Sequence, residues 1–164
     1  MKIALIYSHK SNKTSQVAKL INDFSKSKGI DNLDNEEIHP KKLEDYDLLI
    51  IGAPTWFDGE LPPYWDEMVP ALEDLNLKGK DVAIFGNGDQ VKYPENFGDA
   101  VGLLAEVFES AGAKIVGQTS SDGYSFESSK ALRKEKFLGL ILDFENQQKK
   151  NKERVKNWVK EIGL

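Results

Sequence analysis

Cysteine is absent from the 164 residues of this sequence. A disulfide framework, a thiolate zinc site, an iron–sulfur cluster and a cysteine nucleophile are therefore excluded, and any redox chemistry requires a bound organic cofactor. Long hydrophobic runs are also lacking: the apolar stretch at residues 2–7 is too short for a secretory leader or a membrane span. We therefore expect a cytoplasmic protein with no segment inserted into a membrane.

Positive charge is scarce in the middle of the chain. Residues 54–100 hold ten acidic residues against Lys78, Lys80 and Lys92, a net charge of −7, whereas the whole chain carries −5. An acidic face disfavours binding to nucleic acids and anionic membranes, so we expect neither as a partner. The length and the 40% hydrophobic content predict a single domain, residues 1–164, with one core.

Four apolar runs have the composition of buried strands. Their hydrophobicity is continuous rather than alternating, which is typical of parallel strands covered on both faces. These runs span residues 2–7, 47–53, 81–86 and 114–117. An edge strand is also predicted within residues 30–38, mainly because the chain must return to the sheet after the first helix.

Segments with helical periodicity lie between these strands. The predicted helices cover residues 14–28, about 62–75, 96–111 and about 148–161, and Gly29 is the candidate C-terminal cap of the first. Alternating strands and helices indicate an α/β fold built on a doubly wound parallel sheet.

Residues 118–137 interrupt this alternation. They have no sustained periodicity, and a structureless stretch of this length is unusual inside a compact domain. The apolar run 138–142 follows directly. We interpret residues 118–137 as an insertion that splits the fifth strand into 114–117 and 138–142.

Ligands of an open parallel sheet bind beyond the carboxyl ends of its strands, so three loops require inspection. The first, residues 8–14, leads into a helix and contains two lysines and the hydroxyls of Ser11 and Thr14. Helix N-terminal amides together with these groups favour an anion site. An ordinary helix cap by Ser11 or Asn12 explains the same residues equally well.

The second loop, residues 54–60, carries two adjacent aromatic side chains, Trp56 and Phe57. Both cannot enter the core from one loop, so at least one is expected to face a crevice or a ligand. A planar aromatic ligand would use such a side chain as a stacking wall. The alternative is that Trp56 and Phe57 only cover the edge of the sheet.

The third loop, residues 86–97, contains Gly86 and Gly88, which let the backbone approach a ligand closely. Tyr93 can supply a second stacking face. Taken alone, the run from Gly86 to Asp89 indicates no more than a turn.

Together these loops resemble the flavodoxin family over essentially the whole chain. Pro54-Thr55-Trp56 with Gly59-Glu60-Leu61, and Gly88-Asp89-Gln90 with Tyr93 and Asn96-Phe97, follow that family's two flavin loops. The insertion, with Gly123-Tyr124 and Phe126, resembles the extra loop of the long-chain subgroup. The resemblance implies a five-stranded sheet in the order 2-1-3-4-5 with helices on both faces. It also implies a low-potential one-electron carrier that binds flavin mononucleotide (FMN) non-covalently and acts in place of ferredoxin.

The resemblance also implies a role for individual side chains. Trp56 and Tyr93 would sandwich the isoalloxazine ring, Asp89 would lie at its pyrimidine edge, and the Phe57–Asp58 peptide would lie beside flavin N5. The implied cofactor-binding residues are His9, Lys10, Ser11, Asn12, Lys13, Thr14, Pro54, Thr55, Trp56, Phe57, Asp58, Gly59, Gly86, Asn87, Gly88, Asp89, Tyr93, Asn96 and Phe97.

The first loop departs from the family pattern of hydroxyl, any residue, hydroxyl, Gly, any residue, Thr. Residues 9–14 read His-Lys-Ser-Asn-Lys-Thr, so one hydroxyl and the glycine are missing. Asn12 stands at the glycine position and tolerates a left-handed backbone better than most residues. His9, Lys10 and Lys13 would add charge attraction to the phosphate.

The acidic residues around the second and third loops predict the redox behaviour and the partners. Asp58, Glu60, Asp89 and Glu95 would raise the energy of the fully reduced, anionic flavin, which predicts a low potential for the second electron. The same carboxylates would steer basic redox partners, such as ferredoxin–NADP reductase and other ferredoxin-dependent enzymes. We expect a monomer, with the basic residues 149–160 forming a solvated helix.

Three other functions compete with this interpretation. A flavodoxin-like quinone or azo reductase, using NAD(P)H, needs room above the ring that Tyr93 would fill. A phosphorylated receiver domain needs acidic residues after the first strand and an Asp after the third, where the sequence has Ser8-His9 and Ala53-Pro54. A flavin-free binding domain is kept open by the altered first loop.

Overall fold

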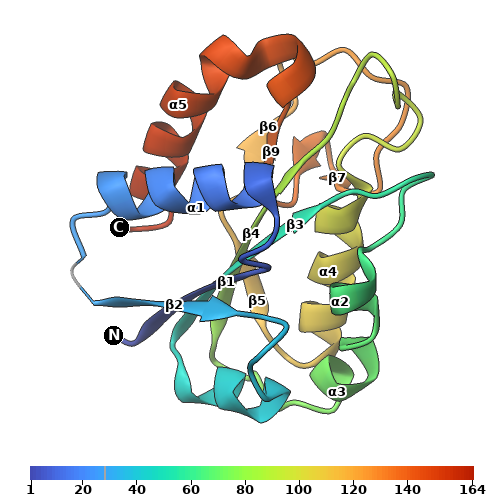
Figure 1. Ribbon diagram of the computed structural model, residues 1–164. Coiled ribbons are helices and arrows are strands. Elements are labelled where there is room, and N and C mark those ends of the chain that lie inside the picture. Colours follow the sequence, from blue (N-terminus) through green and yellow to red (C-terminus); the bar gives the residue numbers. More distant parts are fainter. Residues whose placement is uncertain (28) are drawn as a thin grey trace.

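The computed structural model describes residues 1–27 and 29–164. Its centre is a parallel sheet in the order β2-β1-β3-β4-β5, with the additional strand β9 paired to β4 (Figure 1). This order confirms the predicted fold class. The strands are β1 (Ile3–Tyr7), β2 (Ile30–Asp34), β3 (Leu48–Pro54), β4 (Asp81–Asn87), β5 (Lys114–Val116) and β9 (Leu140–Leu142).

The outer edge of β4 pairs with two separate segments of chain. β5 pairs with the first half of β4, Asp81 opposite Lys114, and β9 pairs with its second half, Phe85 opposite Leu140. The fifth position of the sheet is thus filled by two short strands. The predicted strand segments 114–117 and 138–142 overlap β5 and β9.

Helices cover both faces of the sheet (Figure 1). On one face lie α1 (Asn12–Phe24) and α5 (Phe144–Glu161), which contact each other. On the other face lie α2 (Pro63–Asp66), α3 (Val69–Glu73) and α4 (Asp99–Ser110), and a 3₁₀ helix, η1 (Pro40–Asp45), follows β2. Alternate residues of each strand enter the two cores, as Leu49 and Ile50 of β3 do. This double burial explains the continuous apolar runs.

The first helix is shorter than predicted. It ends at Phe24, and Ser25 has an extended backbone that closes the last turn onto Ile21. The prediction of a helix to residue 28, capped by Gly29, was wrong. Residues 25–27 read Ser-Lys-Ser and offer no apolar side chain to the core. The predicted end itself, Lys28, lies outside the described residues.

Three other helix boundaries also required correction. The helix predicted over 62–75 is two short helices, because Pro70 lacks the N–H that a continuous helix needs and its ring clashes with the preceding turn. The helix predicted from residue 96 begins at Asp99, after the left-handed Gly98. α5 extends from Phe144, four residues before the predicted start, because Asp143 accepts a hydrogen bond from the Asn146 amide as its N-cap. The backbone is non-helical at Gln147, so a kink separates this first turn from the predicted helix 148–161.

The insertion forms a small sheet of its own. Antiparallel strands β6 (Thr119–Ser120), β8 (Lys136–Phe137) and β7 (Leu132–Arg133) pair in that order. Between β6 and β7, Tyr124 and Phe126 pack with Phe137 and Phe97 in an aromatic cluster. The insertion is therefore anchored to the main core at the end of the third loop.

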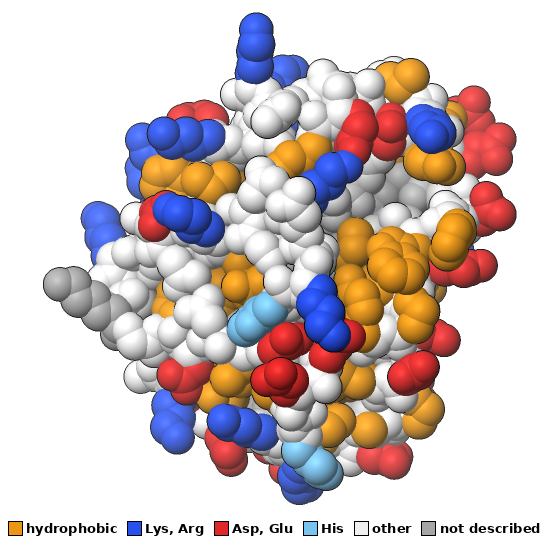
Figure 2. All heavy atoms as spheres, in the orientation of Figure 1, with side chains coloured by type: hydrophobic (Ala, Val, Ile, Leu, Met, Phe, Trp, Pro, Cys, Tyr) orange, Lys and Arg blue, Asp and Glu red, His pale blue; other side chains and the backbone are white. Residues whose placement is uncertain are grey.

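Charge is unevenly distributed over the surface. Figure 2 shows acidic side chains along the edge formed by the second and third loops, whereas lysines and arginines gather over α1 and α5. In the described part of the chain, no helix combines the length and apolar character needed to cross a membrane.

Candidate functional site

Two cavities open at the carboxyl ends of β1, β3 and β4, and Trp56 lines both of them. The larger has a volume of about 390 Å³ and the smaller about 280 Å³. The larger cavity is lined by Thr55, Trp56, Phe57, Gly88, Asp89, Tyr93 and Asn96. The smaller is lined by Ser8, Lys10, Ser11, Glu36, Trp56 and Tyr64.

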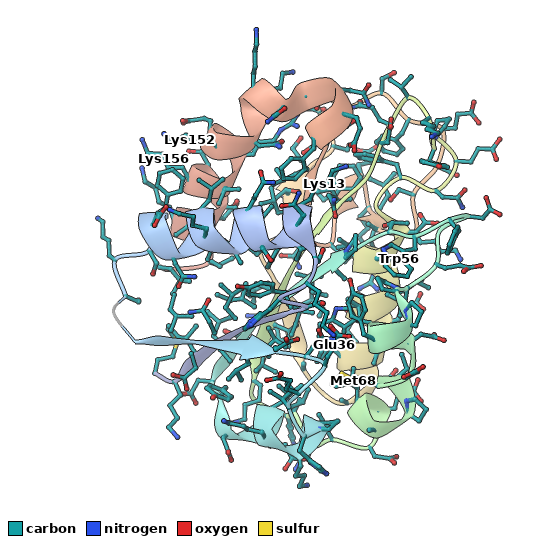
Figure 3. The ribbon with its side chains drawn as sticks, in the orientation of Figure 1. Lys13, Glu36, Trp56, Met68, Lys152 and Lys156 are labelled. Carbon is teal, nitrogen blue, oxygen red and sulfur yellow. The ribbon has the colours of Figure 1, made fainter. Side chains whose placement is uncertain are left out.

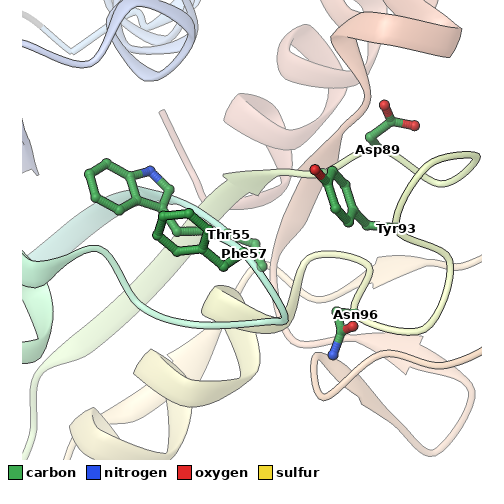
Figure 4. Close-up of a pocket in the computed structure, with 7 residues that line it drawn as sticks. Thr55, Phe57, Asp89, Tyr93 and Asn96 are labelled. Atoms are coloured by element: carbon green, nitrogen blue, oxygen red, sulfur yellow. The ribbon is translucent and has the colours of Figure 1, made fainter.

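The second loop presents its aromatic side chains to solvent. A tight turn joins Trp56 and Glu60 through two backbone hydrogen bonds of 2.9 and 2.7 Å, and Phe57 at its tip has a φ of 46°. Phe57 is 72% exposed and Trp56 37%. Figure 4 shows Phe57 and Tyr93 on opposite sides of the opening. Large exposed apolar groups gathered at one opening indicate a surface that a ligand or partner covers.

This loop is fixed to the start of α4. The Ala100 amide donates to Thr55 Oγ1 at 3.0 Å. Gly59 has a φ of +89°, and a methyl group added there would lie 2.4 Å from Asp99 Oδ2. Only glycine permits both this backbone conformation and this close approach. The turn that carries Trp56 and Phe57 therefore has a defined position against the helix.

The third loop forms the opposite wall of the larger cavity. Tyr93 is 44% exposed, and its amide donates to the Asp89 carbonyl at 2.9 Å. Asp89 Oδ1 accepts hydrogen bonds from the Val91 and Lys92 amides and from the side chain of Asn146. Desolvation acts to raise the pKa of Asp89, but these hydrogen bonds outweigh it and lower the pKa. Asp89 therefore keeps its negative charge at the cavity.

Gln90 connects the third loop to the last helix and to the insertion. It is 5% exposed, and its amide and its Nε2 donate to Asp143 Oδ2 at 3.1 and 2.7 Å. Its Oε1 accepts from the Ser125 amide at 2.6 Å. Asp143 is fully buried and also caps α5. One side chain thus ties three distant segments together beside the cavity.

The insertion supports the third loop along its length. The Glu127 and Ser128 amides both donate to the Pro94 carbonyl, at 2.8 and 3.0 Å, and the Ser128 hydroxyl donates to the Glu95 carbonyl at 2.5 Å. The Ser129 hydroxyl donates to the Phe97 carbonyl. Because these carbonyls belong to the loop that carries Tyr93, the insertion fixes the outer wall of the larger cavity.

The first loop leads directly into α1. Ser11 is at the N-cap position, but its side chain makes no capping hydrogen bond; instead its hydroxyl donates to Thr14 Oγ1 at 2.9 Å. The simple helix-cap interpretation of Ser11 is therefore wrong. The first backbone amides of a helix have no hydrogen-bond acceptor within the helix, and the Ser11 side chain does not accept from them here. These amides are therefore free to bind an anionic ligand.

The basic side chains of the first loop are all close to carboxylates. His9 Nδ1 lies 3.9 Å from Asp34 Oδ2, and Lys10 Nζ lies 3.8 Å from Glu36 Oε1. Lys13, which is labelled in Figure 3, pairs with Glu145 at the start of α5. The positive field that Lys10 and Lys13 would otherwise produce around the first loop is therefore partly cancelled.

Tyr64 belongs to α2 and lines the smaller cavity. Its ring meets that of Trp56 edge to face, with centroids 5.9 Å apart and planes at 90°. Burial raises the pKa of Tyr64 to about 12, opposed by a hydrogen bond with Ser11 and assisted by the nearby charge of Glu36. Its hydroxyl therefore stays protonated at neutral pH and remains available as a donor.

The structure brings together most of the predicted residues of the second and third loops. The prediction that at least one of Trp56 and Phe57 faces a crevice is confirmed, because both line the larger cavity. Pro54, Gly86 and Asn87 lie at the ends of β3 and β4. Phe97 is fully buried in the core. Around the cavities but outside their linings lie His9, Asn12, Lys13, Thr14, Asp58 and Gly59.

Sequence reasoning missed three residues that line the smaller cavity: Ser8, Glu36 and Tyr64. Ser8 directly follows β1, and its position alone was the available signal. Glu36 follows β2, whose carboxyl end lies at the same edge of the sheet, so inspecting that loop as well would have found it. Tyr64 lies in α2, and no local pattern points to it.

The comparisons with known proteins give a consistent result. The flavodoxin family model matches residues 5–158. The chain is 44% identical to a flavodoxin of Nostoc sp. over 98% of this chain and 95% of that protein. It is 42% identical to flavodoxin 1 of Escherichia coli over 91% and 85%. A crystal structure of Fusobacterium nucleatum flavodoxin bound to flavin mononucleotide superposes with a TM-score of 0.92, at 30% identity, covering 98% of this chain and 96% of that one.

Proposed function

Because the chain belongs to the flavodoxin family, we propose that it binds one FMN non-covalently and carries electrons between larger redox enzymes. The observation that carries this proposal is the pair of exposed aromatic side chains, Trp56 and Tyr93, that line one cavity. FMN supplies chemistry that accepts and releases electrons one at a time. The protein is an electron carrier and not an enzyme with a substrate of its own.

The residues present fit this cofactor. In the larger cavity, a planar ring would meet three aromatic side chains and the backbone of Gly88. The smaller cavity shares Trp56 and adds the hydroxyls of Ser8 and Ser11 from the first loop. We assign the ring to the larger cavity and the phosphate to the first loop. The predicted cofactor-binding set is retained on this basis.

The acidic side chains around the cavity favour a low reduction potential. Asp89 is held ionised by its hydrogen bonds, and Asp58, Glu60 and Glu95 lie in the same two loops. Negative charge added to a ligand in this partly desolvated site is repelled by these carboxylates. These carboxylates would therefore make full reduction of a bound FMN less favourable than in water.

The spectrum of the purified protein tests the proposal directly. We expect a yellow protein with flavin absorption, or a colourless one that acquires it when FMN is added. A protein that stays colourless in the presence of FMN contradicts the proposal. Steady oxidation of NADPH by the protein in the presence of a quinone or an azo dye, without another enzyme, would instead favour the alternative function of a quinone or azo reductase. The relatives, which are flavodoxins, do not support that alternative.

Replacing Tyr93 with alanine should weaken FMN binding by about 1–3 kcal/mol, because the ring loses one stacking wall. The affinity is measured from the quenching of flavin fluorescence on binding. Tyr93→Phe is the control: it keeps the aromatic face and should bind FMN within about twofold of the parent. Equal affinity of Tyr93→Ala and the parent would exclude Tyr93 from the stack.

Partners with a basic face are proposed for the exposed edge of this site. The acidic edge seen in Figure 2 supports them, and ferredoxin–NADP reductase and other ferredoxin-dependent enzymes are the candidates. We further propose that residues 1–164 form a single, monomeric, cytoplasmic domain. The insertion at 118–137 supports membership of the long-chain subgroup.

The rate of electron exchange with ferredoxin–NADP reductase should fall as ionic strength rises, because salt screens the attraction between the two surfaces. The double variant Asp58→Asn with Glu95→Gln neutralises two acids of the second and third loops. It should lower the rate at low salt by about three- to tenfold and weaken the dependence of the rate on ionic strength. The control neutralises Glu153 and Glu161 on α5, an equal change in net charge. If stopped-flow measurements give both double variants the same rate and the same dependence on ionic strength, partners do not dock at the acidic edge formed by the second and third loops.

A further inference from the structure

Glu36 places a carboxylate inside the smaller cavity. Its Oε2 accepts a hydrogen bond from the Ser8 hydroxyl at 2.8 Å, and its Oε1 lies 3.8 Å from Lys10 Nζ. The Glu36 side chain is 28% exposed, and Ser8 is 2% exposed. Of the described residues that line this cavity, Glu36 is the one carboxylate. Glu36 therefore takes up the Ser8 hydroxyl as a donor and lies near the Lys10 ammonium group, two groups that could otherwise interact with an anion.

The backbone that carries Glu36 is tied to the surrounding elements (Figure 3). The Asn35 amide donates to the Tyr7 carbonyl at 3.2 Å, and its side-chain Nδ2 donates to the Tyr64 carbonyl at 3.0 Å. The Glu36 amide donates to Asp34 Oδ1 at 3.1 Å. Because Asn35 is 3% exposed and bound on both sides, the Glu36 carboxylate leaves the cavity only by rotation of its own side chain.

We propose that Glu36 is a specificity-determining residue that opposes the phosphate of the bound flavin. This inference rests on the proposed function, which puts that phosphate at the first loop. A phosphate group carries nearly two negative charges at neutral pH, and it would meet a fixed charge of the same sign and a Ser8 hydroxyl that already donates to Glu36. Glu36 therefore reduces the preference of the site for FMN over the same flavin without phosphate, riboflavin.

The test compares Glu36→Gln with Glu37→Gln. Glutamine keeps the size of Glu36 and an oxygen that accepts from Ser8, but removes the charge. Glu37 is the adjacent exposed acid outside the cavity lining, so its variant has the same change in net charge. Dissociation constants for FMN and for riboflavin are measured by fluorescence quenching with the FMN-free form of each protein, at low and at high salt.

We expect Glu36→Gln to bind FMN about tenfold more tightly than Glu37→Gln at low salt, with riboflavin affinities within about twofold of each other. Added salt should narrow the difference for FMN. Inorganic phosphate should raise the thermal unfolding midpoint of FMN-free Glu36→Gln more than that of Glu37→Gln.

An FMN affinity that is unchanged or lower in Glu36→Gln would overturn the inference and leave the proposed function standing. Equal gains for FMN and riboflavin would also overturn it, because the effect would then act on the ring through Trp56 and not on the phosphate. Failure of the parent protein and of both variants to bind FMN would instead refute the proposed function, and the inference with it.

Discussion

Replacing Phe97 with alanine should lower the free energy of unfolding by about 3–5 kcal/mol, because the large cavity left behind is surrounded by side chains that cannot close it. Phe97 is fully buried. Its ring centroid lies 5.4 Å from that of Phe126, 5.5 Å from Tyr124 and 6.0 Å from Phe137. Three of these four rings belong to the insertion, so the substitution removes its main attachment to the core.

Urea unfolding of the FMN-free protein provides the measurement for Phe97→Ala. Phe57→Ala is the matched control: it deletes the same atoms from a side chain that is 72% exposed and should change stability by no more than about 0.5 kcal/mol. Phe97→Leu should lie between the two. If Phe97→Ala and Phe57→Ala unfold at the same urea concentration with equal slopes, the aromatic cluster does not stabilise the fold.

Replacing Asp143 with alanine should lower the free energy of unfolding by about 2–5 kcal/mol, because it removes a helix cap and leaves buried donors of Gln90 without a partner. Asp143 is fully buried and accepts from both the amide and the side chain of Gln90, and from Asn146. Because Gln90 lies in the loop that carries Tyr93, FMN affinity should fall as well. Unfolding and FMN titration are both measured.

Two further variants separate the roles of Asp143. Asp143→Asn keeps one oxygen acceptor and should lose less stability than Asp143→Ala. Glu153→Ala removes an exposed acid from the same helix and should change stability by no more than about 0.5 kcal/mol. A loss for Asp143→Ala no larger than that for Glu153→Ala would show that the buried carboxylate does not hold the third loop.

The strands were predictable because the feature that reveals them, burial of every residue along the strand, can be read from adjacent positions in the sequence. Leu49 and Ile50 are adjacent in the sequence and enter opposite cores, so a buried strand is apolar at every position. The helix ends were less predictable, because each depends on one residue whose effect competes with periodicity. Pro70 breaks a helix whose apolar spacing continues through it, and Asp143 starts one before the periodic stretch begins.

The candidate site was predictable only in part, for a related reason. Trp56, Phe57 and Tyr93 stand out because large aromatic residues in loops cannot all be buried. The contact between Gln90 and Asp143 spans 53 residues, and that between Ser8 and Glu36 spans 28. Neither pair has a local pattern, so these contacts follow only from the way the strands are ordered in the sheet.

The two edges of the sheet have a consequence for the behaviour of the protein at high concentration. An unpaired edge strand is a template on which a second chain can add, and long, flat, apolar edges lead to aggregation. One edge here is divided into β5 and β9, three residues each, with the insertion between them. The other is β2, where Asp31 and Asn32 are exposed. Both edges are poor templates, so the chain should resist self-association even while newly made and still without its cofactor.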